Sequence, residues 1–225
     1  MERHFDEELL QLKKDILYMG TLVEEAIYKS IEALKHLSQK DAIAVIESDK
    51  QVDALEIKIM QTCVDLLALR QPVAADLRFI TMAMQINTDL ERMADLAVDI
   101  CQRVLELVDK PLLKPLVDIP KLAEIACQMT RDVIKAFLNE DIKLAKTVIL
   151  RDSEADALRN LVQLELTNDY MLKDKSTVPR ALPLLLVARH LERICDHATN
   201  IAEDIIYLTQ AKMVKHNISS LQEGS

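Results

Sequence analysis

Apolar residues recur every third or fourth position along most of this chain, the pattern of helices that bury one face. In residues 6–37 these positions are Leu9, Leu12, Ile16, Met19, Val23, Ala26, Ile27, Ile31 and Leu34. Prolines interrupt the pattern, as in Gln71-Pro72, because they disfavour the helical conformation at and before their own position. The pattern predicts helices at about residues 6–37, 38–69, 73–108, 120–138, 139–172 and 179–211.

The predicted helices form two groups of three, separated by a segment that contains Pro111, Pro115 and Pro120. The two halves also align with each other. At an offset of 103 residues the matched pairs are Ala33 and Ala136, Lys40 and Lys143, Ile46 and Ile149, Asp49 and Asp152, and Asp53-Ala54-Leu55 and Asp156-Ala157-Leu158. For the third helix of each half the offset is 101. The sequence therefore predicts an all-α fold of two tandem three-helix bundles related by internal duplication, residues 1–110 and 111–225, with a frayed tail from about residue 213.

Composition narrows the class of protein. The chain has 225 residues, 50% of them hydrophobic, and a net charge of −9. Nucleic-acid binding needs clustered Lys and Arg, so we expect no nucleic-acid partner. Residues 1–7 do not resemble a signal peptide, and the apolar run 181–188 is too short to span a bilayer. We expect a cytoplasmic protein with buried, reduced thiols at Cys63, Cys101, Cys127 and Cys195.

Acidic residues spaced four apart mark the third helix of each half. Glu91, Asp95 and Asp99 form the first series. In the second series Glu192 and Asp196 are followed by Asn200. Two further pairs, Asp49 and Asp53, and Asp152 and Asp156, lie on the preceding helices. Residues four apart share a helix face, so four or five carboxylates converge in each bundle if those helices are neighbours.

Such convergence needs a positive partner. Two unit charges about 5 Å apart repel by roughly 3 kcal/mol at an effective dielectric constant near 20, and Arg92 and Arg193 supply only one charge each. Carboxylates bind hard ions such as magnesium, calcium, manganese and oxidised iron, and zinc if His197 joins them. We predict one metal site per bundle, weaker in the second because of Asn200. The predicted ligands are Asp49, Asp53, Glu91, Asp95, Asp99, Asp152, Asp156, Glu192 and Asp196.

At these residues the sequence resembles the PhoU family of phosphate-signalling regulators. Its two acidic motifs match residues 91–95 and 192–196, and residues 49–53 and 152–156; residues 70–78 resemble its loop before the third helix. The resemblance implies a helical, often homodimeric protein with iron- or zinc-type clusters, a negative regulator of phosphate uptake and of the phosphate-starvation response. The implied partners are the ATPase subunit of the phosphate transporter and a membrane sensor histidine kinase, which would hold the protein peripherally at the membrane.

Two alternatives remain open from the sequence. A ferritin-like di-metal oxidoreductase needs Glu-x-x-His pairs, and none of the five histidines has a Glu three residues before it. A metal-free helical adaptor, with its acids solvated, shares the predicted fold. We find no nucleophile with a base, no Gly-rich phosphate loop and no residue that marks a phosphate pocket. We therefore expect no enzyme, no catalytic residue and no organic cofactor, and we take His190 and His197 as polar-face residues.

Overall fold

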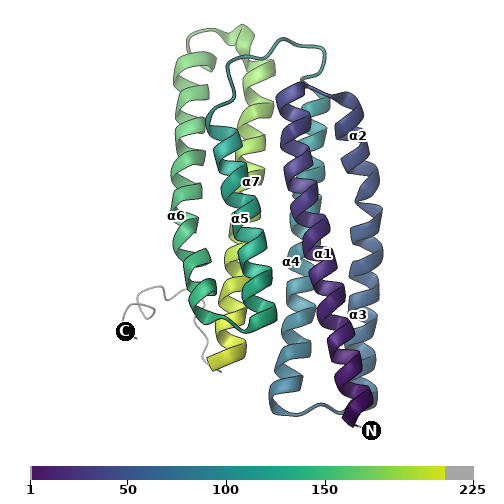
Figure 1. Ribbon diagram of the computed structural model, residues 1–225. Helices are drawn as coiled ribbons and strands as arrows, with labels where there is room; N and C mark the ends of the chain where they lie inside the picture. Colours follow the sequence, from purple (N-terminus) through teal and green to yellow (C-terminus); the bar gives the residue numbers. More distant parts are fainter. Residues whose placement is uncertain (1, 211–225) are drawn as a thin grey trace.

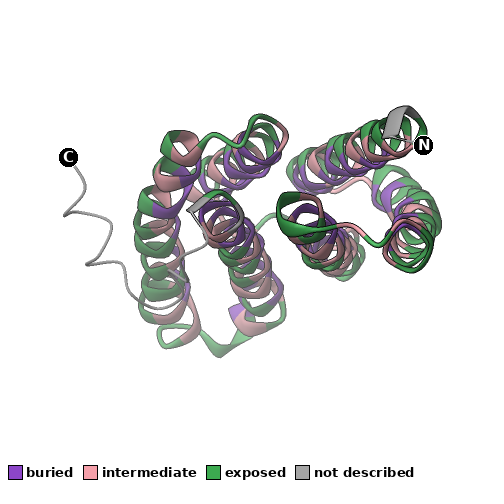
Figure 2. Ribbon diagram, turned by 90° about the horizontal axis from the view of Figure 1, so that it is seen from below, coloured by how far each residue is buried: buried purple, intermediate pink, exposed green. Residues whose placement is uncertain are grey.

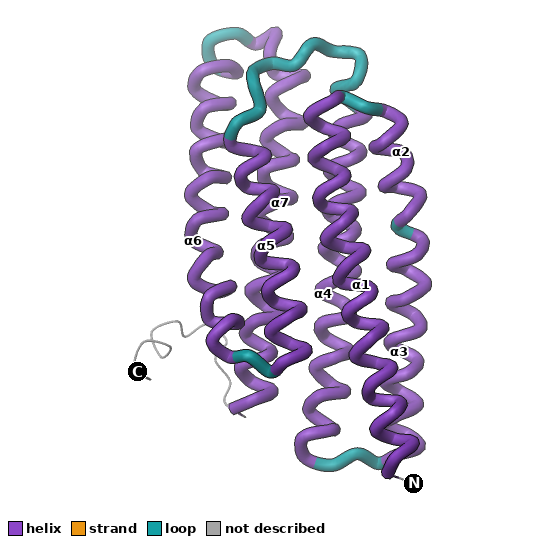
Figure 3. Tube along the Cα trace, viewed as in Figure 1, coloured by secondary structure: helices purple, strands orange, loops and turns teal. Residues whose placement is uncertain are grey.

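The computed structural model of this chain describes residues 2–210, and every regular element in that part is helical (Figure 3). The helices are α1 (Glu2–His36), α2 (Gln39–Ser48), α3 (Lys50–Arg70), α4 (Ala74–Leu105), α5 (Asp118–Asn139), α6 (Ile142–Glu165) and α7 (Val178–Gln210). A π-helix, η1 (Leu166–Met171), and a 3-10 turn, η2 (Lys175–Thr177), connect α6 to α7. The tail predicted to fray lies outside the described residues.

Two bundles stand side by side (Figure 1). The first consists of α1, the α2–α3 arm and α4, and the second of α5, α6 and α7. Residues 106–117 connect them at the upper end in this view. Seen along the helices, the buried faces point into each bundle and toward the seam between the two (Figure 2). The predicted all-α fold of two tandem three-helix bundles is confirmed.

Matching caps begin the second long arm of each bundle. Ser38 Oγ accepts a hydrogen bond from the Asp41 backbone N–H at 3.2 Å, and Asp141 Oδ1 accepts one from the Leu144 N–H at 3.0 Å. Such caps satisfy amide groups that have no partner in the first helical turn. Ser38 and Asp141 lie 103 residues apart, the offset of the repeat. The caps therefore start α2 and α6 at equivalent positions and set the register of the acidic residues that follow.

The prediction of one continuous helix over residues 38–69 is wrong, because the helix is interrupted at Asp49 (Figure 3). The Ser48 hydroxyl donates to the Val45 carbonyl at 2.8 Å, and the Val52 N–H donates to the Asp49 carbonyl at 2.8 Å. Hydrogen bonds of this three-residue type compete with the regular α-helical ladder.

The prediction of one helix over residues 139–172 is also only partly right. Its last turn is π-helical, and the Leu172 N–H donates to the Thr167 carbonyl at 3.0 Å, five residues back. A π-helix widens the turn by one residue, which periodicity in apolar positions does not reveal. The α-helical part, α6, therefore ends at Glu165.

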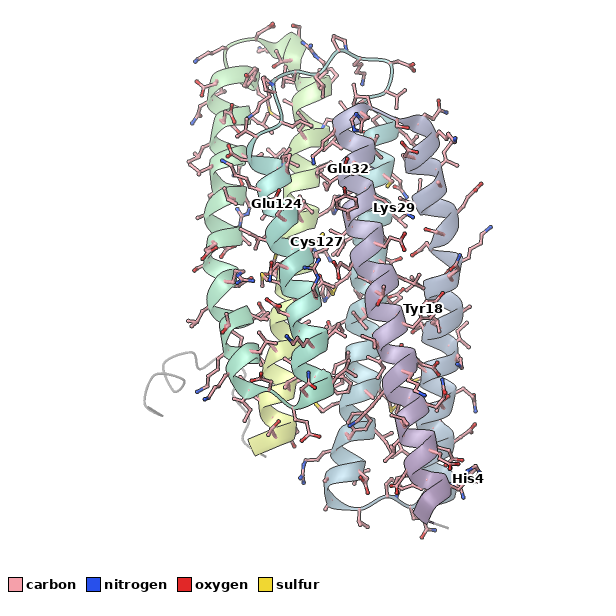
Figure 4. The ribbon with its side chains drawn as sticks, viewed as in Figure 1. His4, Tyr18, Lys29, Glu32, Glu124 and Cys127 are labelled. Atoms are coloured by element: carbon pink, nitrogen blue, oxygen red, sulfur yellow. The ribbon has the colours of Figure 1, made fainter. Side chains whose placement is uncertain are left out.

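Equivalent helices meet at the seam, where α1 packs on α5 and α4 packs on α7. Gly20 of α1 permits the close approach, since a Cβ atom there would lie 2.8 Å from Ile134 Cγ1 on α5. Glu32 on α1 and Glu124 and Cys127 on α5 lie along the same seam (Figure 4). The two bundles are thus packed directly against each other and are not joined by the connector alone.

Candidate metal centre

The first acidic cluster lies where α3 begins and faces α4. Asp49 occupies the break between α2 and α3, and Asp53 lies in the first turn of α3. Loss of solvent around Asp49, together with the charges of Asp53 and Asp95, raises its pKa to about 6. Because Asp95 belongs to α4, the packing of α3 on α4 brings the two predicted acidic motifs of this bundle together.

Glu91 extends this cluster, together with Glu56, an acid that the sequence analysis missed. Burial and then the charge of Asp95 raise the pKa of Glu91, and Glu56 of α3 contributes in the same direction. The buried Asn87 of α4 donates from Nδ2 to the Glu56 carbonyl at 3.0 Å and so fixes the two helices at this level. Glu56 lies three residues after Asp53, a spacing on one helix face that could have identified it.

One arginine partly offsets the charge of the first cluster. Arg92 Nε lies 3.5 Å from Glu91 Oε2, and Arg92 Nη1 lies 3.5 Å from Asp95 Oδ2. The Arg92 side chain is well exposed, so water screens both contacts. Arg92 therefore leaves most of the repulsion among the carboxylates in place.

The second cluster repeats the arrangement between α6 and α7. Desolvation raises the pKa of Asp196 to about 6, and the charges of Glu192, Asp152 and Asp156 act in the same direction. Burial, and then Asp156 and Glu192, raise the pKa of Asp152 as well. These four acids are the sequence-predicted candidates of the second bundle, and the structure brings them together.

Arg159 distinguishes the second cluster from the first. Its Nη2 atom lies 3.0 Å from Glu192 Oε1, so the guanidinium connects α6 to α7. At the repeat offset of 103, Arg159 corresponds to Glu56. The second cluster thus has a cation where the first has another acid, and it carries less net negative charge.

Asp99 lies apart from both clusters. Its Oδ2 atom is 3.8 Å from His190 Nδ1 on α7. A second pair joins the same two helices, with His197 Nδ1 2.8 Å from Asp89 Oδ1 on α4. Each step of four residues turns a side chain about 40° around the helix, so Asp99 is rotated about 80° from Glu91. That rotation directs Asp99 toward the second bundle, away from the α3 acids.

The chemistry of the donor groups fits a hard cation. Burial raises the pKa of the Cys195 thiol, which lies near Asp152, Glu192 and Asp196, well above its usual value. The thiol therefore stays protonated, and carboxylates supply the negative donor atoms of the second cluster. Within residues 2–210, no three His, Cys, Asp or Glu side chains already surround a common point as metal ligands. The carboxylates therefore gather on facing helices without forming a closed set of ligands.

The PhoU domain model matches residues 16–104 and 119–205. This chain belongs to the PhoU family. The two matches fall one on each bundle and confirm both the predicted duplication and the resemblance noted in the sequence.

Curated PhoU relatives cover most of this chain. It is 42% identical over 209 residues to the "Phosphate-specific transport system accessory protein PhoU homolog" of Aquifex aeolicus, covering 93% of this chain and 94% of that protein. It is 34% identical over 212 residues to the PhoU protein of Escherichia coli K12, covering 94% and 88%. Both names describe accessory proteins of phosphate transport.

Crystal structures of PhoU proteins share the fold. The PhoU of Pseudomonas aeruginosa superposes with a TM-score of 0.89 at 33% identity, covering 92% of this chain and 100% of that one. The phosphate transport system regulatory protein PhoU of Streptococcus pneumoniae gives 0.87 at 30% identity, covering 94% and 99%. In this chain, no helix within residues 2–210 is long and apolar enough to cross a membrane.

Proposed function

We propose that this PhoU-family chain is a non-enzymatic, metal-binding accessory protein of a phosphate-specific transport system. In this role it acts as a negative regulator of phosphate uptake and of the phosphate-starvation response. The observation that supports metal binding is the gathering of carboxylates from facing helices in both bundles, with the pKa of Asp49 and of Asp196 raised to about 6. Membership of the PhoU family supports the phosphate-transport setting.

The first cluster would hold the metal more strongly. Its candidate ligands are Asp49, Asp53, Glu56, Glu91 and Asp95, and those of the second cluster are Asp152, Asp156, Glu192 and Asp196. A bound iron, zinc, manganese or magnesium ion would supply positive charge between α3 and α4, where the acids otherwise repel each other. In the second cluster Arg159 already supplies part of that charge, so we expect lower metal occupancy there.

The proposed partners are the transporter ATPase subunit and a membrane sensor histidine kinase. Their names come from the family to which this chain belongs, and they would bring a cytoplasmic homodimer to the membrane surface. A metal ion that joins two helices stiffens a bundle, so metal occupancy would change the shape that the partners contact.

Metal analysis tests the metal-binding part of this proposal. We expect at least one ion per chain as purified, removal by chelation, and a large loss of metal from the double variant Asp95→Ala, Asp196→Ala. The control Asp65→Ala, Asp169→Ala removes two exposed acids outside the clusters and should keep its metal. Less than one ion per chain in the wild type, together with equal contents in the two variants, would contradict metal binding.

A pull-down of the transporter ATPase with this chain, with and without phosphate, tests the regulatory part. We expect the amount captured to change with phosphate, because a regulator of uptake must respond to supply. Identical capture under both conditions would count against regulation while leaving the metal sites unaffected.

Two observations favour a metal-free helical adaptor as the second candidate. The acids do not form a closed set of ligands within residues 2–210, and both clusters already contain an arginine contact. The adaptor has the same fold and the same partners, so metal content alone separates it from the first candidate.

A further inference from the structure

A cavity of about 660 Å³ lies between α6 and α7, on the side of the second cluster where the arginines gather. Its polar lining consists of Arg159 and Gln163 from α6 and Arg189, Glu192, Arg193 and Asp196 from α7. The α7 residues follow one another at spacings of three, one and three, so they share one helix face. A cavity of this size with a few convergent polar groups is typical of small-molecule sites.

Most of the positive charge in this cavity is free to bind an anion. Arg159 Nη2 lies 3.0 Å from Glu192 Oε1 and 3.9 Å from Asp156 Oδ1, so these two carboxylates offset its charge. In the part of the chain that the structure describes, no carboxylate lies within ion-pair distance of Arg189 or Arg193, and neither guanidinium forms a hydrogen bond. The Nε atom of Arg159 is buried without a hydrogen-bond partner. Guanidinium groups match the oxygens of phosphate-type anions as paired donors.

The repeat shows that this lining is particular to the second bundle. The equivalents of Arg159 and Arg189 in the first bundle are Glu56 and Thr88, at offsets of 103 and 101. Only Arg193 has an arginine counterpart, Arg92, which lies beside Glu91 and Asp95. Two of the three arginines are therefore absent from the equivalent positions of the first bundle, so the shared fold does not require them.

The carboxylate of Asp196 determines which anion fits best. An ionised carboxylate only accepts hydrogen bonds. At mildly alkaline pH, inorganic phosphate still has one P–OH group that can donate to it. Sulfate has no such group, and a phosphate monoester has lost its last proton, since its second pKa is about 6. The lining has three arginines and two carboxylates, Glu192 and Asp196, and Glu192 is already paired with Arg159. The remaining carboxylate, Asp196, therefore favours inorganic phosphate over both other anions.

We propose that this arginine-lined cavity binds inorganic phosphate. The three guanidinium groups donate to its oxygens, and the Asp196 carboxylate accepts a hydrogen bond from its P–OH group. The site goes beyond the proposed metal-dependent function, because the arginines require no metal ion. Asp196 is shared with the second acidic cluster, so the test uses chelated protein.

The test titrates anions into the full-length chain, freed of metal by chelation, at pH 8 and constant ionic strength. Calorimetry and ³¹P NMR detect the binding. The probes are inorganic phosphate, sulfate and glycerol 3-phosphate. We expect phosphate to bind at least about tenfold more tightly than the other two anions, which corresponds to one charged hydrogen bond.

Three variants locate the binding. Arg189→Gln, Arg193→Gln should weaken phosphate binding by about tenfold or more. The control Lys40→Gln, Lys143→Gln removes the same charge at exposed positions outside the cavity and should leave the affinity unchanged. Asp196→Asn should remove the preference for phosphate over sulfate.

Three results would overturn the proposal. Absence of phosphate binding by the chelated wild type, or equal binding by the double arginine variant, would show that the cavity is not the site. Equal affinity for phosphate and sulfate would overturn the assignment of phosphate as its ligand. None of these results depends on metal content, so this site and the proposed metal sites can fail separately.

Discussion

At the scale of single residues, the pKa of Asp49 shows how burial and neighbouring carboxylates disfavour a charged acid when no cation is bound. Burial, Asp53 and Asp95 together raise the pKa of Asp49 from 3.8 to about 6. Between these two values the folded protein binds more protons than the unfolded chain, so folding stability falls as the pH rises. At neutral pH the ionised Asp49 therefore destabilises the metal-free fold, and a bound cation would offset this effect.

Replacing this carboxylate by an amide should stabilise the metal-free protein. We expect Asp49→Asn to raise the free energy of unfolding by about 1–2 kcal/mol at pH 7, since two pKa units correspond to at most about 2.7 kcal/mol and solvent screens part of that. The gain should be much smaller at pH 4, where Asp49 is protonated in the folded protein and about half protonated in the unfolded chain. Urea unfolding of chelated protein at pH 4 and pH 7 measures it, with the exposed Asp65→Asn as control. An equal change at both pH values would contradict the assigned cause.

At the scale of helices, the contact of α1 with α5 depends on a missing side chain. A Cβ atom on Gly20 would lie 2.8 Å from Ile134 Cγ1 and 3.2 Å from Ile134 Cδ1. Ile134 is itself buried at 4% exposure, so it has little room to move away. This one position therefore sets how closely the two bundles can approach along these helices.

Gly20→Ala should destabilise the protein by about 1–3 kcal/mol through overpacking, although alanine favours helix by up to about 1 kcal/mol. Urea unfolding measures the change. In an Ile134→Ala background the clashing atoms are absent, so the same substitution should become neutral or stabilising, and the double-mutant cycle gives the coupling. A stabilising effect in the wild-type background would show that α1 and α5 lie further apart than described.

The sequence predicted the positions of the helices better than their breaks and their terminal turns. Apolar spacing located all the long helices, but it could not show the break at Asp49, where the Ser48 hydroxyl competes with the backbone, or the π-turn after Glu165. For the acids, spacing by four correctly placed neighbours on one face. This spacing left out the rotation of about 40° that each step of four residues adds. Over the two steps from Glu91, this rotation turns Asp99 toward His190. Comparing the two halves at the offset of 103 residues could have identified Arg159, because the equivalent position holds Glu56.

At the scale of the whole molecule, metal should act as a stabilising ligand whose effect depends on pH. A cation at about 100 times its dissociation constant adds about 2.7 kcal/mol, which raises the melting temperature of a chain of this size by roughly 5–10 °C. The rise should be smaller at pH 5 than at pH 7, because Asp49 and Asp196, with pKa values of about 6, must lose their protons to bind metal.

Calorimetry of chelated and metal-loaded protein at both pH values measures this shift. Asp95→Ala should reduce it, and Asp65→Ala should not. The same rise in melting temperature at pH 5 and pH 7 would mean that these carboxylates are not the ligands.

The seam between the bundles joins like to like, since α1 packs on α5 and α4 on α7. Gly20 and Ile134 touch there, and their repeat counterparts, Ala123 and Ile31, line the same seam further along. This is the geometry of a two-fold symmetric pair of identical subunits, here fused into one polypeptide. In an unfused pair every mutation appears twice, once in each subunit. Fusion removes that constraint, so position 56 can hold glutamate while its twin at position 159 holds arginine.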